Sequence, residues 1–270
     1  MAFKLGPRAI SAGYRLAAFD RIGSTNEQAL LRARQGEHGP IWFVTSEQTA
    51  GRGRRQRAWI APRGNLAGSV LEIIETSPAV AATLGFAAGL ALEAALQKVR
   101  PEVSRSAGGS DYPEFSLKWP NDLLAGHEKL AGILLEAEAV PDGRLAVVVG
   151  IGTNVVAAPE GTPTPATSLK AIGIEISAEE LFAALSDSWV EFYGLWDRGR
   201  GFGDIRRLWL ERAAGLGQPV AVRAGGSTLA GTFDSIDDAG SMIVKTSSGD
   251  RIQVSAGDVY FGSAASAGAA

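Results

Sequence analysis

The feature that most constrains the fold is an alternation of apolar runs of strand length with amphipathic segments of helix length. Strands are expected at about 14–19, 41–46, 66–74, 115–119, 130–139 and 145–151. Helical periodicity follows Ser24 and recurs over 78–99, 178–198 and 204–214. Strands that alternate with helices are typical of an α/β arrangement, in which helices cover a sheet.

The pattern changes near 215–218. From Pro219 onward, short alternating runs are separated by glycine and aspartate turns; they are Val220–Val222, Gly231–Phe233, Met242–Val244 and Ile252–Val254. This spacing predicts a small all-β domain over 215–262, after a main domain over 1–214. Residues 263–270 carry only small side chains, so a disordered tail is expected there.

Composition excludes several classes of protein. With 270 residues, 46% of them hydrophobic, the chain is long enough for one large and one small domain. A net charge of -3 argues against a general nucleic-acid coat, which would be strongly basic. The absence of cysteine excludes disulfides, thiolate metal sites and a cysteine nucleophile. His38 and His127 lack metal-ligand spacing, so no zinc site is expected.

Two apolar segments could be mistaken for a signal peptide or a membrane span, but neither has the required pattern. The start, Met1–Pro7, reaches glycine and proline before any continuous apolar core, unlike a signal peptide. The stretch 78–99 is rich in alanine and leucine, but Thr83, Glu93 and Lys98 favour a packed helix of a core over a membrane span. We therefore expect a cytoplasmic protein without a membrane partner.

Four arginines fall within six residues after the apolar run Ile41–Val44. They are Arg52, Arg54, Arg55 and Arg57, with Gly51 and Gly53 between and before them. Glycines let the backbone approach a ligand closely, and guanidinium groups offer forked donors that match carboxylate and phosphate oxygens. Taken alone, such a cluster more often belongs to a solvated basic loop or to one that grips nucleic acid.

Four further segments change that interpretation. Polar groups follow or end apolar runs in Gly23–Asn26, Glu47–Ala50, Ser116–Glu136 and Val147–Val155, the third of which contains Lys118-Trp119-Pro120-Asn121-Asp122. With the arginine segment, their order and spacing resemble the catalytic domain of biotin protein ligases, over roughly 14–262. The resemblance implies a mixed β-sheet flanked by helices, like that of class II aminoacyl-tRNA synthetases, and a small C-terminal SH3-like β-barrel.

The resemblance also implies an activity. The family joins biotin to ATP, which gives biotinyl-5'-adenylate and pyrophosphate, and a lysine of a biotin carboxyl carrier protein then attacks the adenylate. Because the carboxylate and the triphosphate repel one another, catalysis consists of positioning and of cationic stabilisation at the α-phosphate. ATP and biotin are thus the expected substrates, with Mg²⁺, and no enzyme nucleophile is needed.

Lys118 and Arg54 are the expected catalytic residues. Lys118 closes a strand, and the following proline fixes a turn that leaves the ammonium group at the strand end, where ligand sites of α/β proteins gather. By resemblance, Lys118, Arg52 and Arg54 contact the biotin carboxylate and the adenylate phosphate. The competing interpretation of Lys118 is a lysine that extends to water from a sheet edge.

The rest of the arginine segment is expected to divide its roles. Gly51 and Gly53 permit close approach, whereas Arg55 and Arg57 organise the loop or bind pyrophosphate. Trp59 offers a flat face to adenine or anchors the loop as a buried side chain. Gln56 stands where many members of the family carry glycine, a departure that reduces flexibility but leaves the Arg-Gly-Arg pattern intact.

Biotin's ureido ring needs donors and acceptors inside an apolar pocket. By resemblance, the residues that bind biotin include Ser24, Thr25, Asn26, Gln48 and Gly132. Ser24 is also a plausible helix cap, with Glu27 completing a capping box.

The nucleotide is assigned its own polar residues. Asn154, at the end of its strand, is placed to contact adenine or ribose. Asn121 and Asp122 are expected to assist with phosphate or magnesium, with Asp122 as the candidate metal ligand.

The expected partner is a biotin carboxyl carrier domain of acetyl-CoA carboxylase or a related carboxylase. Homodimerisation is left open. A DNA-binding repressor would need a winged helix before the first strand, and only about 13 residues precede it, so no DNA partner is expected. A lipoate-type adenylating ligase and a non-catalytic biotin-binding module remain alternatives, although relatives that handle lipoyl or octanoyl groups would lack the Gly-Arg-Gly-Arg-Arg segment.

Overall fold

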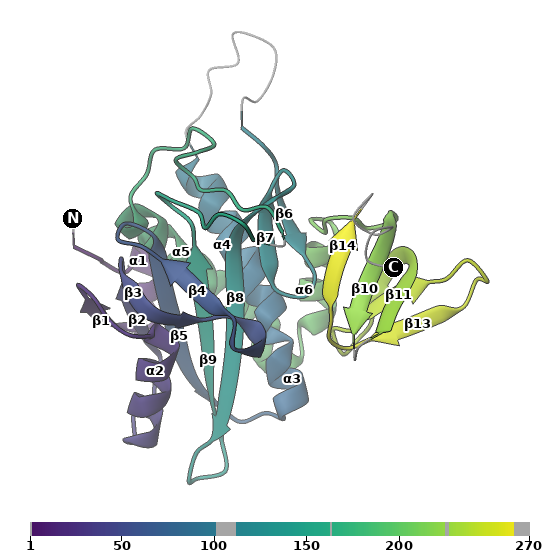
Figure 1. Ribbon diagram of the computed structural model, residues 1–270. Coiled ribbons are helices and arrows are strands. Elements are labelled where there is room, and N and C mark those ends of the chain that lie inside the picture. The colour runs from purple at the N-terminus through teal and green to yellow at the C-terminus, as the bar shows by residue number, and fades with distance from the viewer. Residues whose placement is uncertain (1, 101–111, 163, 225–226, 262–270) are drawn as a thin grey trace.

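The fold contains a large β-sheet with helices around it, a small β-sheet and a separate two-stranded hairpin (Figure 1). The computed structural model describes residues 2–100, 112–162, 164–224 and 227–261. The disordered tail expected at 263–270 lies outside these residues.

The large sheet has seven strands and is mixed, as the sequence predicted. In spatial order the strands are β1 (Arg15–Phe19), β2 (Ile41–Thr45), β5 (Leu66–Ile74), β9 (Leu145–Thr153), β8 (Glu128–Ala139), β7 (Asp122–Ala125) and β6 (Phe115–Lys118). β1 and β2 are parallel, and the other neighbours are antiparallel. The sequence analysis missed β7, because Pro120 and Asn121 turn the chain back immediately after Lys118.

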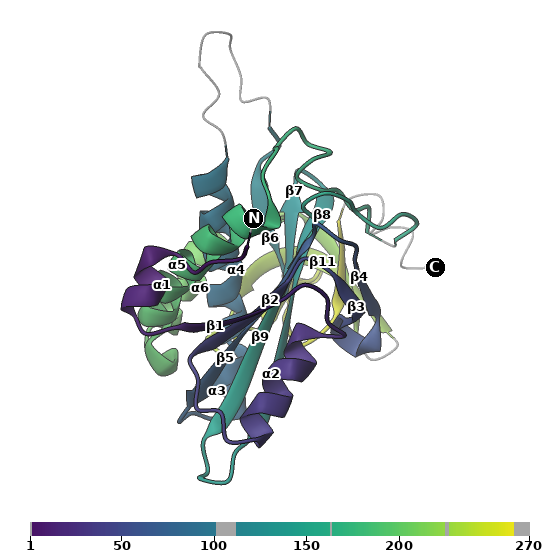
Figure 2. The ribbon, with the colours of Figure 1, turned by 90° about the vertical axis from the view of Figure 1, so that its left-hand side faces the viewer.

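Helices cover the two faces of this sheet unequally (Figure 2). On one face lie α3 (Pro78–Ala82), α4 (Leu84–Val99), α5 (Ala178–Trp196) and α6 (Phe202–Leu210). The segment expected to be one helix over 78–99 is thus two, joined at Thr83, whose hydroxyl donates to Val80 O at 2.6 Å. These helices bury Leu90 and Trp189 against sheet residues such as Trp42 and Val149.

The opposite face carries a single helix, α2 (Thr25–Arg34). Ser24 caps it, because the Ser24 hydroxyl accepts from the Glu27 N–H at 3.4 Å, as the sequence predicted. α2 buries Ala29 and Leu30 over the half of the sheet that carries Phe43 and Val148. It leaves the β8 and β9 ends uncovered, and that is where the cationic hairpin described below lies.

A short helix that the sequence analysis missed, α1 (Pro7–Ser11), attaches the N-terminal segment to α5. The Gly6 N–H donates to Ser186 Oγ at 2.8 Å, and the Ala9 N–H donates to Asp187 Oδ1 at 3.0 Å. α5 itself begins with a capping box formed by Ser177 and Glu180.

The small sheet is antiparallel and has five strands. In spatial order these are β13 (Arg251–Val254), β12 (Met242–Lys245), β11 (Ser227–Ile236), β10 (Pro219–Ala224) and β14 (Asp258–Phe261). The predicted small all-β domain is therefore present, and β14 is a strand that the sequence analysis missed.

Three contacts fix the small sheet beside β6. The Trp119 indole N–H donates to Gly240 O at 3.0 Å, and Arg206 pairs with Asp238 at 2.6 Å. The segment that leads to β10 bonds along the sheet edge, with the Ala214 N–H donating to Leu117 O at 2.9 Å. As a result, β14 faces the ends of β6 and β7 (Figure 1).

One segment among the described residues, Pro78–Val99, is long and apolar enough to cross a membrane by length and composition alone. In the fold, 72% of its most apolar window is buried inside the protein. This burial suits the packed core helices that the sequence predicted.

A buried carboxyl group lies between the sheet and α5. Glu72 Oε1 accepts hydrogen bonds from Tyr14 Oη at 2.7 Å and from Trp189 Nε1 at 3.1 Å. Burial raises the pKa of Glu72 to about 7, although these hydrogen bonds act in the opposite direction.

The raised pKa of Glu72 predicts that the free energy of unfolding depends on pH. Because the pKa of Glu72 is higher in the folded than in the unfolded chain, its stabilising contribution is complete below about pH 4.5 and is lost as the pH rises through about 7. The Glu72→Gln variant should gain up to about 3 kcal/mol relative to the parent between pH 4.5 and 8, as measured by denaturant unfolding. A Glu75→Gln control changes an exposed glutamate just beyond the same strand and should follow the parent. A constant difference between parent and Glu72→Gln across this range would contradict the assignment.

Candidate active site

The floor of the candidate site consists of sheet positions that lack side chains. Gly150 and Gly152 are two residues apart on β9 and so face the same side, and Gly132 of β8 pairs with Gly152. A Cβ at Gly150 would overlap the Asn26 amide, and one at Gly152 would overlap the Trp59 indole. These positions must therefore be glycine, because the side chains of two other elements occupy the space above them.

The arginine segment is a β-hairpin, whereas the sequence analysis treated it as a loop. β3 (Gln48–Arg52) pairs with β4 (Ala58–Ala61), and a 3₁₀ turn over Arg54–Gln56 joins them. A Cβ at Gly51 would lie 2.5 Å from Trp59 O on the facing strand, so this glycine permits the pairing of the hairpin itself. Arg55 and Gln56 have φ values of 56° and 60°, in the left-handed region that glycine favours.

Lys118 lies at the end of β6, as predicted, and is buried with 7% of its surface exposed. Its Nζ donates to Thr164 Oγ1 at 3.4 Å and lies 5.5 Å from the Phe261 ring centroid. Burial lowers the pKa of Lys118, Lys129 acts in the same direction, and the charge of Asp122 opposes them. Lys118 is therefore a desolvated cation and does not extend to water.

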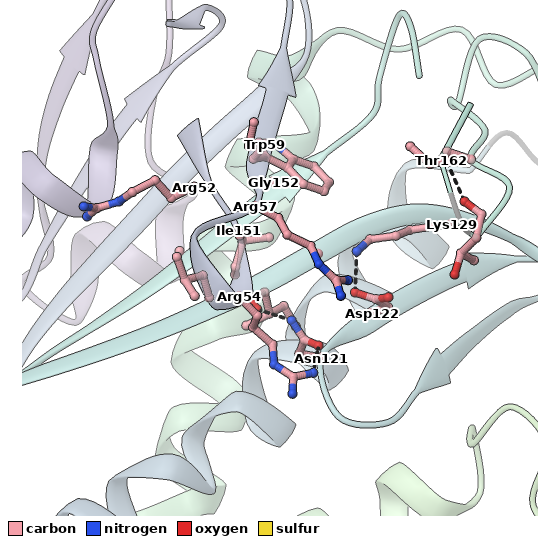
Figure 3. A pocket seen from close by; sticks show the side chains of 18 of the residues that line it. Arg52, Arg54, Arg57, Trp59, Asn121, Asp122, Lys129, Ile151, Gly152 and Thr162 are labelled. Atoms are coloured by element: carbon pink, nitrogen blue, oxygen red, sulfur yellow. Dashed lines mark hydrogen bonds and ion pairs between the residues drawn. The ribbon is translucent and has the colours of Figure 1, made fainter. Parts of the chain in front are cut away.

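Arg54 is a second partly buried cation beside Lys118. Its guanidinium donates to Asn121 Oδ1 at 3.0 Å and to Gly257 O at 3.3 Å (Figure 3). Burial lowers the pKa of Arg54, whereas the charge of Asp258 raises it. The Asn121 amide in turn donates to Ile133 O at 2.7 Å, so Asn121 fixes Arg54 against β8.

Lys129 is a third cation, to which the sequence analysis assigned no role. Its Nζ lies 2.6 Å from Asp122 Oδ1 and 5.5 Å from the Trp59 ring centroid. The Trp59 indole and the Lys129 ammonium group therefore both lie over the glycine floor, near Gly132. This arrangement is compatible with both roles expected of Trp59, an aromatic face and an anchor.

The same ion pair bears on the expected metal ligand. Asp122 is engaged by Lys129, and no group of three or more His, Cys, Asp or Glu residues in the described ranges could hold a metal ion. Mg²⁺ that enters with ATP takes most of its oxygens from phosphates and water. The carboxylates near the pocket therefore do not form a site in which the protein alone could hold a metal ion.

The polar residues expected to bind biotin form a connected network at the start of α2. Gln48 Oε1 accepts from the Thr25 N–H at 2.9 Å, and the Ser69 hydroxyl lies 2.7 Å from Thr25 Oγ1 and 2.6 Å from Asn26 Oδ1. Ser69 is fully buried, and the sequence analysis missed it. The network orients Gln48 and Asn26 over the glycine floor.

Arg52 points away from the other arginines (Figure 3). Its guanidinium lies 3.5 Å from Glu136 Oε1, and Glu136 Oε2 accepts from Asn26 Nδ2 at 2.8 Å. Glu136 therefore connects the hairpin to the network at the start of α2.

One pocket brings most of the expected site residues together. It is lined by Ser24, Thr25, Asn26, Gln48, Arg52, Gly53, Arg54, Arg57, Trp59, Lys118, Asn121, Asp122, Gly132 and Asn154. Gly51 and Arg55 were also expected in the site and are not among the lining residues. Asn154 is buried, and its Oδ1 has no hydrogen-bond partner. Since this oxygen is shielded from solvent, a ligand donor would reach it only after the side chain shifts.

Several lining residues were not in the expected set. They include Lys129, Gly150, Gly152, Asp258 and Tyr260. The two-residue spacing of the glycines is a signal that a strand pattern reveals, since it places both on one face. Five cationic side chains and two carboxylates line the pocket, so its charge suits an anionic ligand.

The role of Glu136 predicts a local effect on the hairpin. Glu136→Gln removes the charge that holds Arg52, so amide hydrogen exchange over residues 48–52 should become about three- to tenfold faster. Glu138→Gln is a matched control, because Glu138 lies two positions along the same strand and pairs with Arg34 of α2 instead. Equal exchange in Glu136→Gln and in the parent would show that this pair does not hold the hairpin.

Comparisons with known proteins point in one direction. The model of the Biotin/lipoate A/B protein ligase family matches residues 18–154, and that of the Biotin protein ligase C terminal domain matches residues 215–262. The chain is 38% identical to a biotin--[acetyl-CoA-carboxylase] ligase of Paracoccus denitrificans, covering 90% of this chain and 98% of that protein. It is 34% identical to the protein of the same name from Mycobacterium tuberculosis, covering 88% and 86%.

Solved structures agree at the level of the fold. The structure of a biotin protein ligase from Aquifex aeolicus in complex with biotin and ATP matches with a TM-score of 0.73. It covers 92% of this chain and 99% of that one, at 23% identity.

Proposed function

Because this chain belongs to the Biotin/lipoate A/B protein ligase family, we propose that it is an ATP-dependent biotin–protein ligase. It activates biotin as biotinyl-5'-adenylate and transfers the biotinyl group to a lysine of a carboxylase carrier domain. The observation that carries the proposal is the pair of desolvated cations, Lys118 and Arg54, in a pocket that has more cations than carboxylates. Such cations suit a reaction between two anions.

In the first step, a biotin carboxylate oxygen attacks the α-phosphorus of ATP, and the bond to the bridging oxygen breaks so that pyrophosphate leaves. Lys118 and Arg54 offset the charge of the two approaching anions and of the crowded phosphorus centre. The electrostatic stabilisation by these two cations is strong because both are shielded from water, at least in part, and are held in fixed positions before the substrates arrive. Arg57, at the pocket edge, pairs with Asp258 at 2.9 Å and is the cation proposed to contact the departing pyrophosphate.

In the second step, the neutral amine of the acceptor lysine attacks the acyl carbon of the adenylate. The bond from carbon to the phosphate oxygen breaks, AMP leaves, and the amine proton is released. The chain supplies no covalent nucleophile. Its residues hold the mixed anhydride in position and shield it from water.

The two ends of the pocket suit the two halves of the adenylate. The network of Thr25, Asn26 and Gln48 offers amide and hydroxyl groups to the biotin ureido ring. The Trp59 face and the unpaired Asn154 Oδ1 suit adenine, whose exocyclic amine is a donor. Mg²⁺ would enter with the ATP phosphates, and Asp122 remains a proposed ligand that Lys129 would have to release.

The acceptor is a carboxylase carrier domain, as the names of the relatives support. We propose that the small domain assists transfer and does not bind DNA, since among its described residues it offers β-strands and no reading helix. We propose a cytoplasmic location; the burial of Pro78–Val99 in the core argues against a membrane span by this segment. Homodimerisation, which the sequence leaves open, can be decided by sedimentation.

The test is exchange of labelled pyrophosphate into ATP, followed by transfer of labelled biotin to a carrier domain. Exchange that requires biotin, with transfer to the carrier lysine, is expected. Exchange with lipoate in place of biotin would support the lipoate-type ligase. Biotin binding without any exchange would support the non-catalytic module.

Lys118→Ala tests the proposed catalytic cation. Loss of a preorganised charge at the reacting phosphate should slow adenylate formation by ~10²-fold or more, while folding is preserved. Lys245→Ala is the control, because Lys245 also ends a strand but is exposed. Single-turnover formation of labelled adenylate measures both variants. A folded Lys118→Ala chain that forms adenylate at the parental rate would exclude this role.

A further inference from the structure

The small domain contacts the cationic hairpin at two consecutive residues. Asp258 Oδ2 accepts hydrogen bonds from Arg55 at 2.8 Å and from Arg57 at 2.9 Å. Next to it, Gly257 O accepts from the Arg54 guanidinium at 3.3 Å. Three arginines of the hairpin turn are therefore held by the first residue of β14 and the residue before it.

We propose that Asp258 is a positioning residue, a carboxylate latch that holds the arginine hairpin closed across the nucleotide half of the pocket. The inference rests on the proposed ligase function and goes beyond it, because it assigns the small domain a direct part in retaining the adenylate. Asp258 acts through Arg55 and Arg57, and it does not touch the reacting atoms.

The electrostatics of the turn require such a partner. Arg54, Arg55 and Arg57 repel one another, and Arg55 and Gln56 occupy the left-handed region of φ that non-glycine residues adopt at a cost. The Asp258 carboxylate offsets this repulsion. Although burial acts to raise the pKa of Asp258, the hydrogen bond and charge of Arg57 and the charge of Arg55 keep it below its ordinary value. The latch is therefore ionised at neutral pH.

The positions of Arg55 and Arg57 suit a role in retaining the adenylate more than a role in forming it. Their side chains are 47% and 62% exposed, unlike the buried Lys118. Arg57 and Asp258 line the pocket, whereas Arg55 does not. Loss of the latch should therefore ease opening of the hairpin, and it should affect release of the adenylate more than bond formation at Lys118 and Arg54.

The experiment measures adenylate release. Labelled adenylate is formed on the enzyme from biotin and ATP, the complex is diluted into excess unlabelled biotin and ATP, and loss of bound label is followed. Asp258→Asn should release adenylate about tenfold faster, since it removes two ion pairs at a partly exposed site. Single-turnover formation of adenylate, measured in parallel, should change less than its release does. Asp258→Glu, which keeps the charge, should restore much of the retention.

Asp238→Asn is the matched control. Asp238 also connects the small domain to the catalytic domain through an arginine, Arg206 at 2.6 Å, but it does not line the pocket. A general loosening of the domains would accelerate release in both variants, whereas the latch predicts an effect at Asp258 alone. Equal release from the parent and Asp258→Asn, or equal acceleration in Asp238→Asn, would overturn the proposal.

Two further measurements separate the latch from the proposed function. Combining Asp258→Asn with Arg57→Gln should release adenylate no faster than Asp258→Asn alone, and fully additive effects would contradict the latch. Hydrogen exchange over residues 50–58 of the ligand-free chain should be faster in Asp258→Asn than in the parent. If the parent forms no adenylate, the ligase function fails, and this exchange measurement still decides the latch, with unchanged exchange overturning it.

Discussion

The site depends on two cations, the buried Lys118 and the partly buried Arg54, which lie where the small sheet meets the large one. A buried charge is costly unless another charge or a polar group compensates for it. Here the nearby carboxylates are already shared, because Asp122 pairs with Lys129 and Asp258 pairs with Arg55 and Arg57. An anionic ligand completes the electrostatics of the pocket, and each surrounding element helps to keep these cations in place.

The glycine floor complements this charge. Gly132, Gly150 and Gly152 lack side chains where Trp59 and Asn26 approach the sheet. Farther along β9 the same face carries Ala146 and Val148, which pack under α2. The strand therefore serves the core at one end and the site at the other. This division explains why a single helix suffices on that face.

Local patterns of the sequence predicted much of this molecule. The strands of the large sheet except β7, the cap at Ser24 and the placement of Lys118 at a strand end all followed from periodicity and turn residues. What remained hidden depends on distant pairings. In the sequence, Asp258 looks like an ordinary turn aspartate. Only the pairing of β14 with β10 brings it to Arg55 and Arg57. The sequence likewise offered no reason to place Lys129 in the site, because its ion pair with Asp122 forms only when β7 lies beside β8.

The arginine segment shows a different limit. Its composition predicted an anion site but not a hairpin, because residues 54–56 form a turn with two non-glycine residues at positive φ. Such a conformation is imposed by tertiary contacts, here those of Arg54, Arg55 and Arg57 with the small domain.

We propose that this chain makes and holds an activated anhydride through positioning and cationic stabilisation, without a covalent enzyme intermediate. Mass spectrometry of the protein incubated with biotin and ATP tests it most directly, under native and then denaturing conditions. The account predicts a complex with biotinyl-adenylate in the native spectrum and the unmodified chain after denaturation. A covalent biotinyl or adenylyl adduct on the denatured chain, or no adenylate in the native complex, would contradict it.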